Sequence, residues 1–158
     1  MTRLLTLMRH GHAAWPPDGP TGGDDYRPLT DDGRHRLQAA LPALRENGLA
    51  PLLILHSPLT RATQTARVVA EGLGLLADHL QMEGRLRPGF EESKLRILLM
   101  AYEDCDWLML VGHNPDMQRV MSTLARKQVT FSPGKVATVE LTHWQPTLRG
   151  YLKWAHPA

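Results

Sequence analysis

Short apolar segments alternate with amphipathic segments along this chain, and this alternation is the feature that most constrains its fold. Three apolar segments, at residues 3–8, 52–56 and 107–111, have the length of buried strands. The segments that follow them carry apolar residues at the spacing of one helix face. Buried strands that alternate with helices are typical of parallel sheets. The sequence therefore predicts an α/β fold of three layers, α/β/α, with a mostly parallel sheet and helices on both of its faces.

Capping residues indicate where the first two helices begin and end. Thr30 is a good N-cap for a helix that ends at Gly48. Ser57 is an N-cap candidate with Pro58 at the first helical position, and that helix is expected to run to about Leu73.

The second half of the chain continues the same pattern and closes with a different one. A short extended piece is expected at 80–82, a helix at 91–102 and another helix after Asn114. Strands at 135–142 and 148–154 follow each other without a helix, through a turn at Gln145, Pro146 and Thr147. We therefore expect an antiparallel edge strand on the otherwise parallel sheet.

Length and composition limit the class of protein. The chain has 158 residues, which fits one domain over 1–158. Its net charge of +2 gives no support for a nucleic-acid partner. The single cysteine, Cys105, rules out an internal disulfide and fits a reducing compartment. The apolar run at residues 4–8 is too short for a signal peptide, and no stretch approaches the roughly 20 apolar residues of a membrane helix. We expect a cytoplasmic protein without a membrane partner.

Polar residues stand at the ends of the three apolar strands. Arg9 and His10 end the first, His56 and Ser57 end the second, and His113 follows the third. In open α/β sheets, sites form beyond the carboxyl ends of the strands. These residues are therefore the candidates for the chemistry of the chain.

The pair Arg9-His10 suits phosphoryl transfer. A neutral imidazole offers a nitrogen nucleophile, and the planar guanidinium matches phosphate oxygens. Nearby positive charge favours the neutral imidazole, and a backbone carbonyl on the second ring nitrogen would hold the ring. Gly11 permits the turn that would bring both side chains into one pocket. Considered alone, however, His10 is more simply a polar residue at the end of a strand.

Arg61 and His113 add positive charge at two predicted helix starts. Arg61 falls in the first turn of a helix, where the macrodipole mildly disfavours a cation unless an anion binds there. His113 precedes another helix and suits a phosphate oxygen as a cation or as a hydrogen-bond donor. Each of them alone is more simply a solvated or loop residue.

Together, four segments resemble the histidine phosphatase superfamily, also called the phosphoglycerate-mutase-like family. The resemblance covers nearly the whole chain in order. Its motifs are RHG at 9–11, RPLT-x-x-G at 27–33, SPLxRAxQTA at 57–66 and GHNP at 112–115.

The resemblance implies a mechanism and a site. The RHG histidine of this family attacks phosphorus in line, and water hydrolyses the resulting phosphohistidine. Carried over, His10 is the nucleophile, Arg9 and Arg61 clamp the phosphoryl oxygens, and His113 stabilises charge. No metal and no cofactor is expected. Two more positions in the matched motifs, Ser57 and Asn114, are candidates for substrate binding.

Within the superfamily, the chain is most similar to the SixA branch of protein phosphohistidine phosphatases. The short length leaves no room for a large cap insertion. The resemblance implies Arg27 as a further residue of the phosphate site. Many relatives carry a glutamate general acid in a Leu-x-Glu segment, but here Leu86-Arg87 is followed by Pro88. A phosphoramidate leaving group needs less protonation than an alkoxide, so this departure favours either phosphohistidine over sugar phosphates or a low activity.

Other functions remain open at this point. Small phosphate esters fit an uncapped site as well, and a phosphate-binding pseudoenzyme would keep the arginines without needing the acid. His10 and His12 have metal-ligand spacing, but further ligands are missing nearby. A cysteine phosphatase is excluded, because its Cys-x5-Arg loop would need an arginine at Val111. A mutase needs the acid and generally a larger cap. Trp15, in the long loop after the first strand, either lines the pocket or packs.

Overall fold

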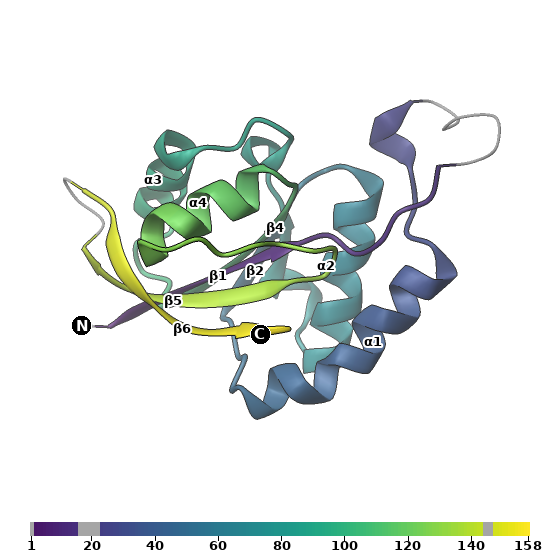
Figure 1. Cartoon of the computed structure of the whole chain (residues 1–158), viewed down its shortest axis with the longest axis horizontal. Coiled ribbons are helices and arrows are strands. Elements are labelled where there is room, and N and C mark those ends of the chain that lie inside the picture. The colour runs from purple at the N-terminus through teal and green to yellow at the C-terminus, as the bar shows by residue number, and fades with distance from the viewer. Residues whose placement is uncertain (1, 16–22, 144–146) are drawn as a thin grey trace.

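One mixed sheet forms the centre of the computed structural model, which describes residues 2–15, 23–143 and 147–158 (Figure 1). Within these residues the strand order is β3-β2-β4-β1-β5-β6. The strands are β1 (Arg3–Arg9), β2 (Leu53–His56), β3 (Leu80–Met82), β4 (Trp107–Gly112), β5 (Val136–His143) and β6 (Arg149–His156). The α-helices are α1 (Asp31–Glu46), α2 (Thr60–Leu73), α3 (Glu92–Ala101) and α4 (Asp116–Ala125), and the 3₁₀-helices are η1 (Asp24–Tyr26), η2 (Ala77–His79) and η3 (Gly84–Leu86).

The strand directions confirm the expected mostly parallel sheet with an antiparallel side. β4 pairs in parallel with both β1 and β2, and β2 pairs in parallel with β3. β5 is antiparallel to β1, and β6 is antiparallel to β5. The parallel part is built by the strand–helix alternation, whereas β5 and β6 follow each other directly in the chain.

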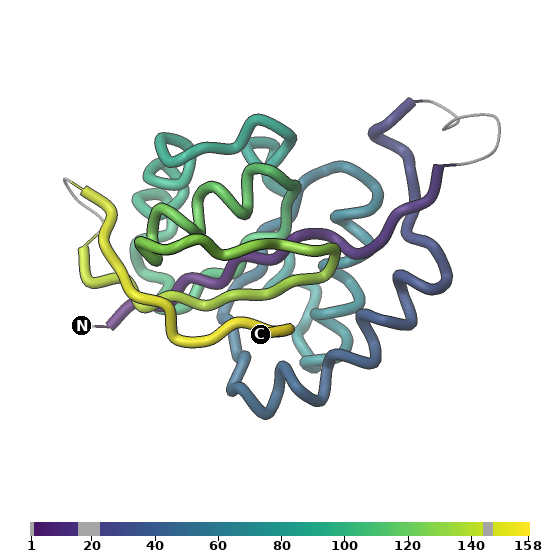
Figure 2. Tube along the Cα trace, in the orientation of Figure 1, coloured from purple at the N-terminus to yellow at the C-terminus, as the bar shows by residue number. Residues whose placement is uncertain are grey.

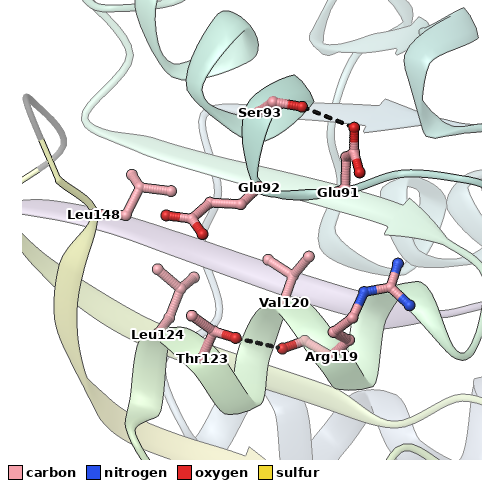
Figure 3. A pocket seen from close by; sticks show the side chains of 8 residues that line it. All are labelled: Glu91, Glu92, Ser93, Arg119, Val120, Thr123, Leu124 and Leu148. Atoms are coloured by element: carbon pink, nitrogen blue, oxygen red, sulfur yellow. Dashed lines mark hydrogen bonds between the residues drawn. The ribbon is translucent and has the colours of Figure 1, made fainter.

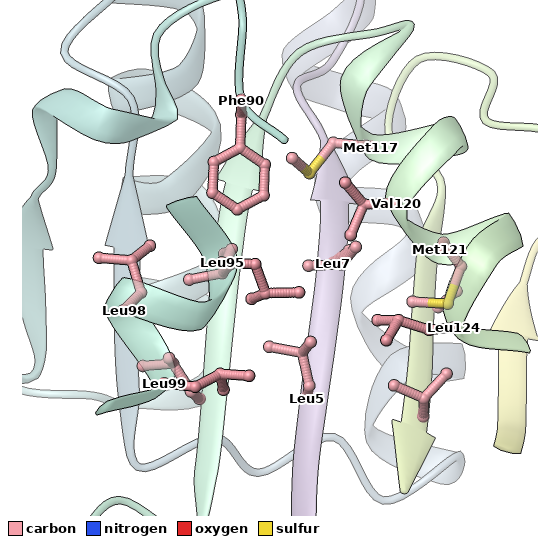
Figure 4. Close-up of a cluster of buried hydrophobic side chains, with 14 of the residues drawn as sticks. Leu5, Leu7, Phe90, Leu95, Leu98, Leu99, Met117, Val120, Met121 and Leu124 are labelled. Carbon is pink, nitrogen blue, oxygen red and sulfur yellow. The ribbon is translucent and has the colours of Figure 1, made fainter. Parts of the chain in front are cut away.

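Helices cover both faces of the sheet, so the three layers are as expected (Figure 1). Successive side chains of a strand point to opposite faces. Leu5 and Leu7 of β1 therefore pack in a cluster with apolar residues of α3 and α4, which Figure 4 shows. Met8, the next residue, packs in a second cluster with apolar residues of α1 and α2. The tube in Figure 2 shows β1 passing between these two layers.

The start of α2 differs from the expectation. Ser57 and Pro58 were expected at its N-cap and first helical position, but the helix begins at Thr60 and its N-cap is Leu59, which has extended backbone angles. The Ser57 hydroxyl instead accepts a hydrogen bond from the Leu59 N–H and contacts His113. The Ser57 side chain thus contacts His113 from another part of the fold and does not cap α2.

The other predicted boundaries hold to within one or two residues. Thr30 is the N-cap of α1, and its hydroxyl accepts from the Gly33 N–H at 2.8 Å. The extended piece at 80–82 is the edge strand β3. Of the turn expected between the last two strands, Gln145 and Pro146 lie outside the described residues. No helix in the described part of the chain is long and apolar enough to cross a membrane.

Backbone hydrogen bonds bring the carboxyl ends of β1, β2 and β4 to one edge of the sheet. The His10 N–H donates to the Gly112 carbonyl, and the Ser57 N–H donates to the Val111 carbonyl, each at 3.0 Å. The side chains that follow these three strands are therefore held in a fixed relation to one another. This edge contains the candidate site.

Candidate active site

His10 lies at the carboxyl end of β1 with 8% of its surface exposed. Its Nδ1 is 2.7 Å from the Gly11 carbonyl oxygen, so Nδ1 carries the proton and donates it. Nε2 therefore holds a lone pair, and it accepts a hydrogen bond from Nε of Arg61 at 3.2 Å. Burial, with the positive charge of Arg61 and Arg9 adding to it, lowers the pKa of His10 to about 3. The ring is neutral at physiological pH and presents a nucleophilic nitrogen.

Arg61 is buried in the first turn of α2, as the sequence predicted. Thr65, one turn further along, ties this helix to the loop after β1. Its hydroxyl donates to the Arg61 carbonyl at 2.7 Å and accepts from the Gly11 N–H at 3.0 Å. The QTA part of the motif thus sets the position of Arg61 relative to His10.

Asp24 is a site residue that the sequence reasoning missed. Its Oδ2 accepts from Nη2 of Arg61 at 2.9 Å, and its Oδ1 accepts from Nε of Arg27 at 2.8 Å. Its carbonyl oxygen also accepts from Nη1 of Arg61 at 2.7 Å. The carboxylate therefore joins two arginines that were expected to bind phosphate. An acidic residue three positions before Arg27 is the sequence signal that could have indicated this contact.

Arg27 is joined to Arg61 through the carboxylate of Asp24. Its guanidinium carbon is 3.9 Å from the centroid of the Trp15 ring. Trp15 was expected either to line the pocket or to pack. It contacts Arg27 and still exposes 63% of its surface, so it lies at the margin of the site.

Arg9 and Asn114 share one acceptor. Nη1 of Arg9 and Nδ2 of Asn114 each donate to the Phe131 carbonyl at 2.9 Å. The Oδ1 atom of Asn114 accepts from the Gln118 N–H at 3.2 Å, which places Asn114 at the start of α4. Among the described atoms, the buried Nε of Arg9 has no hydrogen-bond partner. Arg9 therefore retains a free donor, while the Asn114 amide is used within the fold.

His113 lies beside His10, with 5.2 Å between the two ring centroids. Its Nε2 is 2.8 Å from the Ser57 hydroxyl. Burial, followed by the charge of Arg61, lowers the pKa of His113 to about 4. His113 is thus neutral at physiological pH, and the cationic form considered from the sequence is not the form that the structure favours.

The carboxylates near Pro88 are paired with arginines. Asp25 accepts from Nη1 of Arg87 at 3.3 Å, which joins η1 to the segment where a glutamate was expected. Glu83 accepts from the Arg85 N–H at 2.8 Å. The segment that lacks the acid is therefore next to the acidic residues of η1. In the described part of the chain, no group of three or more His, Cys, Asp or Glu residues forms a metal-binding cluster.

A cavity of about 410 Å³ lies elsewhere, between α3 and α4. Figure 3 shows the carboxylates of Glu91 and Glu92 on one side of it and Arg119 on the other. None of its lining residues belongs to the candidate site at the end of β1. The presence of a cavity therefore does not by itself identify the functional site, and the chemistry of the side chains does.

The structural comparison supports the same fold throughout the chain. The protein histidine phosphatase SixA complexed with tungstate superposes with a TM-score of 0.81 and 24% identity, covering 96% of this chain and 95% of that one. A SixA protein from Agrobacterium tumefaciens superposes with a TM-score of 0.81 and 21% identity, covering 97% of this chain and 96% of that one. These similarities show that the fold is SixA-like.

Sequence comparison identifies the family. An uncharacterized protein of Picosynechococcus is 37% identical over 115 residues, which cover 72% of this chain and 67% of that protein. An acid phosphatase of Mycobacterium tuberculosis is 38% identical over 97 residues, which cover 57% of this chain and 47% of that enzyme, less than half its length. The family described as "Histidine phosphatase superfamily (branch 1)" matches residues 5–94, a segment that contains Arg9, His10 and Arg61. This chain belongs to the histidine phosphatase superfamily.

Proposed function

We propose that this chain is a metal-independent phosphatase that takes a phosphoryl group onto Nε2 of His10 and then transfers it to water. One observation carries the proposal. The Gly11 carbonyl holds the proton of His10 on Nδ1, while the buried, neutral ring directs the lone pair of Nε2 at the guanidinium of Arg61. A nucleophilic nitrogen that contacts a phosphate-binding side chain is the arrangement that phosphoryl transfer requires.

In the proposed reaction, Nε2 of His10 attacks phosphorus in line with the leaving group. Arg61 and Arg27 bind the phosphoryl oxygens with the donors that now contact Asp24, and Arg9 adds its free Nε–H. These arginines supply the positive charge for which other phosphatases use a metal. His113 adds a neutral hydrogen-bond donor beside His10.

The substrate class that we propose is a phosphohistidine carried by a protein. The SixA-like fold supports this assignment, as does the proline at position 88, because an imidazole leaves without a strong acid. Two exposed aromatic residues also fit a protein substrate. Trp15 contacts Arg27, and Tyr26 belongs to η1 next to Asp24; their exposed fractions are 63% and 65%. Exposed aromatic side chains are typical of protein-binding surfaces.

Small phosphate esters are the second candidate. The identity of 38% to the acid phosphatase of Mycobacterium tuberculosis favours them. A binding protein without catalytic activity is the third possibility, and the neutral, well-oriented His10 argues against it.

Turnover of p-nitrophenyl phosphate and of a phosphohistidine peptide tests the proposal. The wild-type protein should hydrolyse both, with the higher kcat/KM for the peptide, and His10→Ala should reduce turnover to background. His12→Ala is the matched control, because His12 is an exposed histidine two residues away and should retain activity. Phosphate binding without turnover by the wild-type protein would make the chain a binding protein and contradict the proposal.

A further inference from the structure

Asp24 and the nucleophile His10 both contact the same edge of the Arg61 side chain. Nε and Nη2 of Arg61 are the two donors on one edge of the guanidinium. Nε donates to Nε2 of His10, and Nη2 donates to Oδ2 of Asp24. This edge of an arginine matches two oxygens of a single phosphate or carboxylate group. The two acceptors that it holds here therefore lie side by side.

A phosphoryl group on Nε2 of His10 would consequently lie beside Asp24, because both contact the same edge of Arg61. Its oxygens need the same Arg61 donors and the Nε–H of Arg27, which the carboxylate now occupies. The carboxylate has to give up these donors when the phosphoryl group binds. It nevertheless stays at the site, because the carbonyl of the same residue is held by Nη1 of Arg61.

The site is more exposed to solvent at Asp24 than at His10. The Asp24 side chain is 46% exposed, whereas only 8% of His10 is exposed. Partial burial acts to raise the pKa of Asp24, but hydrogen bonds from Arg27 and Arg61 outweigh it and leave the pKa below its usual value. The side chain is therefore a carboxylate before the reaction, able to accept a proton rather than to donate one. The neighbouring carboxylates Asp25 and Glu83 contact Arg87 and Arg85 instead.

We propose that Asp24 is the general base that activates the water in the second half of the reaction. This assignment rests on the proposed function, since it requires phosphorylated His10. Asp24 takes one proton from a water molecule while the water oxygen forms its bond to phosphorus. The P–Nε2 bond breaks, and its electron pair returns to the ring of His10, which keeps its proton on Nδ1. Inorganic phosphate departs, and the exposed Asp24 releases its proton to solvent.

The test separates formation of the phosphoenzyme from its hydrolysis. Phosphorylated His10 is quantified by rapid quenching into alkali, followed by mass spectrometry, with the phosphohistidine peptide as substrate. In Asp24→Asn, hydrolysis should slow by about 10²–10⁴-fold, while formation changes by less than about tenfold, so the phosphoenzyme accumulates. Asp25→Asn is the matched control, because it removes the adjacent carboxylate of η1 and should leave both steps near the wild-type rates.

A second variant addresses the possibility that asparagine distorts the site. In Asp24→Ala, added formate should restore hydrolysis of the phosphoenzyme in proportion to its concentration, because a free carboxylate replaces the missing base. The same addition should have no effect on Asp25→Ala. Thermal unfolding of each variant shows whether the fold is retained.

Three results would overturn the assignment. Hydrolysis by Asp24→Asn at the wild-type rate, with tighter inhibition by phosphate, would make Asp24 only a competitor for the arginines. Equal losses in formation and hydrolysis would make it only a support for Arg61 and Arg27. Failure of formate to rescue folded Asp24→Ala would also contradict a role as base. Failure of the wild-type protein to phosphorylate His10 would instead refute the proposed function itself.

Discussion

The hydroxyl of Ser57 lies 2.8 Å from Nε2 of His113, and both side chains are buried. The Leu59 N–H already donates to this hydroxyl, which leaves the hydroxyl proton available for His113. We therefore assign the hydroxyl as donor to Nε2, so that the neutral ring of His113 carries its own proton on Nδ1. Among the described atoms, that buried Nδ1 has no hydrogen-bond partner. Under the proposed function, this free donor would bind a phosphoryl oxygen.

Replacement of Ser57 by alanine should weaken catalysis through His113. Without the hydroxyl, the proton of His113 is no longer held on Nδ1, and one hydrogen bond to the substrate is lost in part of the molecules. The loss of one such bond is about 1 kcal/mol, or roughly fivefold in kcat/KM. Steady-state kinetics with the phosphohistidine peptide measure the change. An unchanged kcat/KM in a folded Ser57→Ala would show that Ser57 does not orient His113.

The two buried histidines should make stability fall in acid. Burial lowers the pKa of His10 to about 3 and that of His113 to about 4, whereas both titrate near 6.5 in the unfolded chain. Below about pH 6.5 the unfolded state binds protons that the folded state does not, so the free energy of unfolding decreases by up to about 1.4 kcal/mol per pH unit for each histidine. Above about pH 7.5 these two groups contribute almost no slope.

Urea denaturation at pH 7.5, 6 and 5 measures this dependence. His10→Gln should show a shallower decrease than the wild-type protein, because one of the two buried groups no longer titrates. His12→Gln is the matched control, because it makes the same substitution at an exposed histidine two residues away. Equal slopes for His10→Gln and the wild type would contradict the lowered pKa of His10.

The Thr65 hydroxyl should be essential for the geometry between Gly11 and Arg61. Thr65→Val keeps the shape but leaves the buried Gly11 N–H without its acceptor. We expect a loss of about 1–3 kcal/mol in the free energy of unfolding, together with a lower kcat. Thr65→Ser keeps the hydroxyl and should retain most of the activity. Equal activities of the valine and serine variants would show that the hydrogen bonds of Thr65 do not position the site.

Gly33 should be required by close packing rather than by its backbone angles. A Cβ at this position would lie 2.3 Å from the His12 carbonyl oxygen, so α1 would have to move away from the loop after β1. We expect Gly33→Ala to cost about 1–3 kcal/mol. Gly84→Ala is the control, because no atom lies within 4 Å of its Cβ. Differential scanning calorimetry of the two variants measures the difference, and similar Tm values would contradict the steric explanation.

The exposed aromatic residues should matter more for a protein substrate than for a small one. Tyr26→Ala is expected to raise KM for a phosphohistidine-bearing protein several-fold, while p-nitrophenyl phosphate is hydrolysed as before. Tyr151→Ala, which removes an exposed tyrosine of β6, is the control. Equal effects of Tyr26→Ala on the two substrates would argue for small esters as the natural substrates.

The sequence alone predicted most of the fold, because strand and helix patterns are local. The apolar runs that became β1, β2 and β4 were evident in the chain. The helix starts were less accurate at Ser57, whose hydroxyl is used by His113, a residue 56 positions away. No capping pattern contains such a distant partner, so the N-cap was placed two residues too early.

The motifs likewise indicated which side chains meet, but not how they are paired. His10, Arg61 and His113 follow strands that end at one edge of the sheet, and this much followed from the order of the elements. The tertiary structure alone decided that Nε2 of His10 faces Arg61 and that Asp24 occupies the arginines. The residues that make up the candidate site can be identified from short local motifs. Its protonation states and its ionic contacts depend on burial and on distances between segments far apart in the chain, which exist only once the chain has folded.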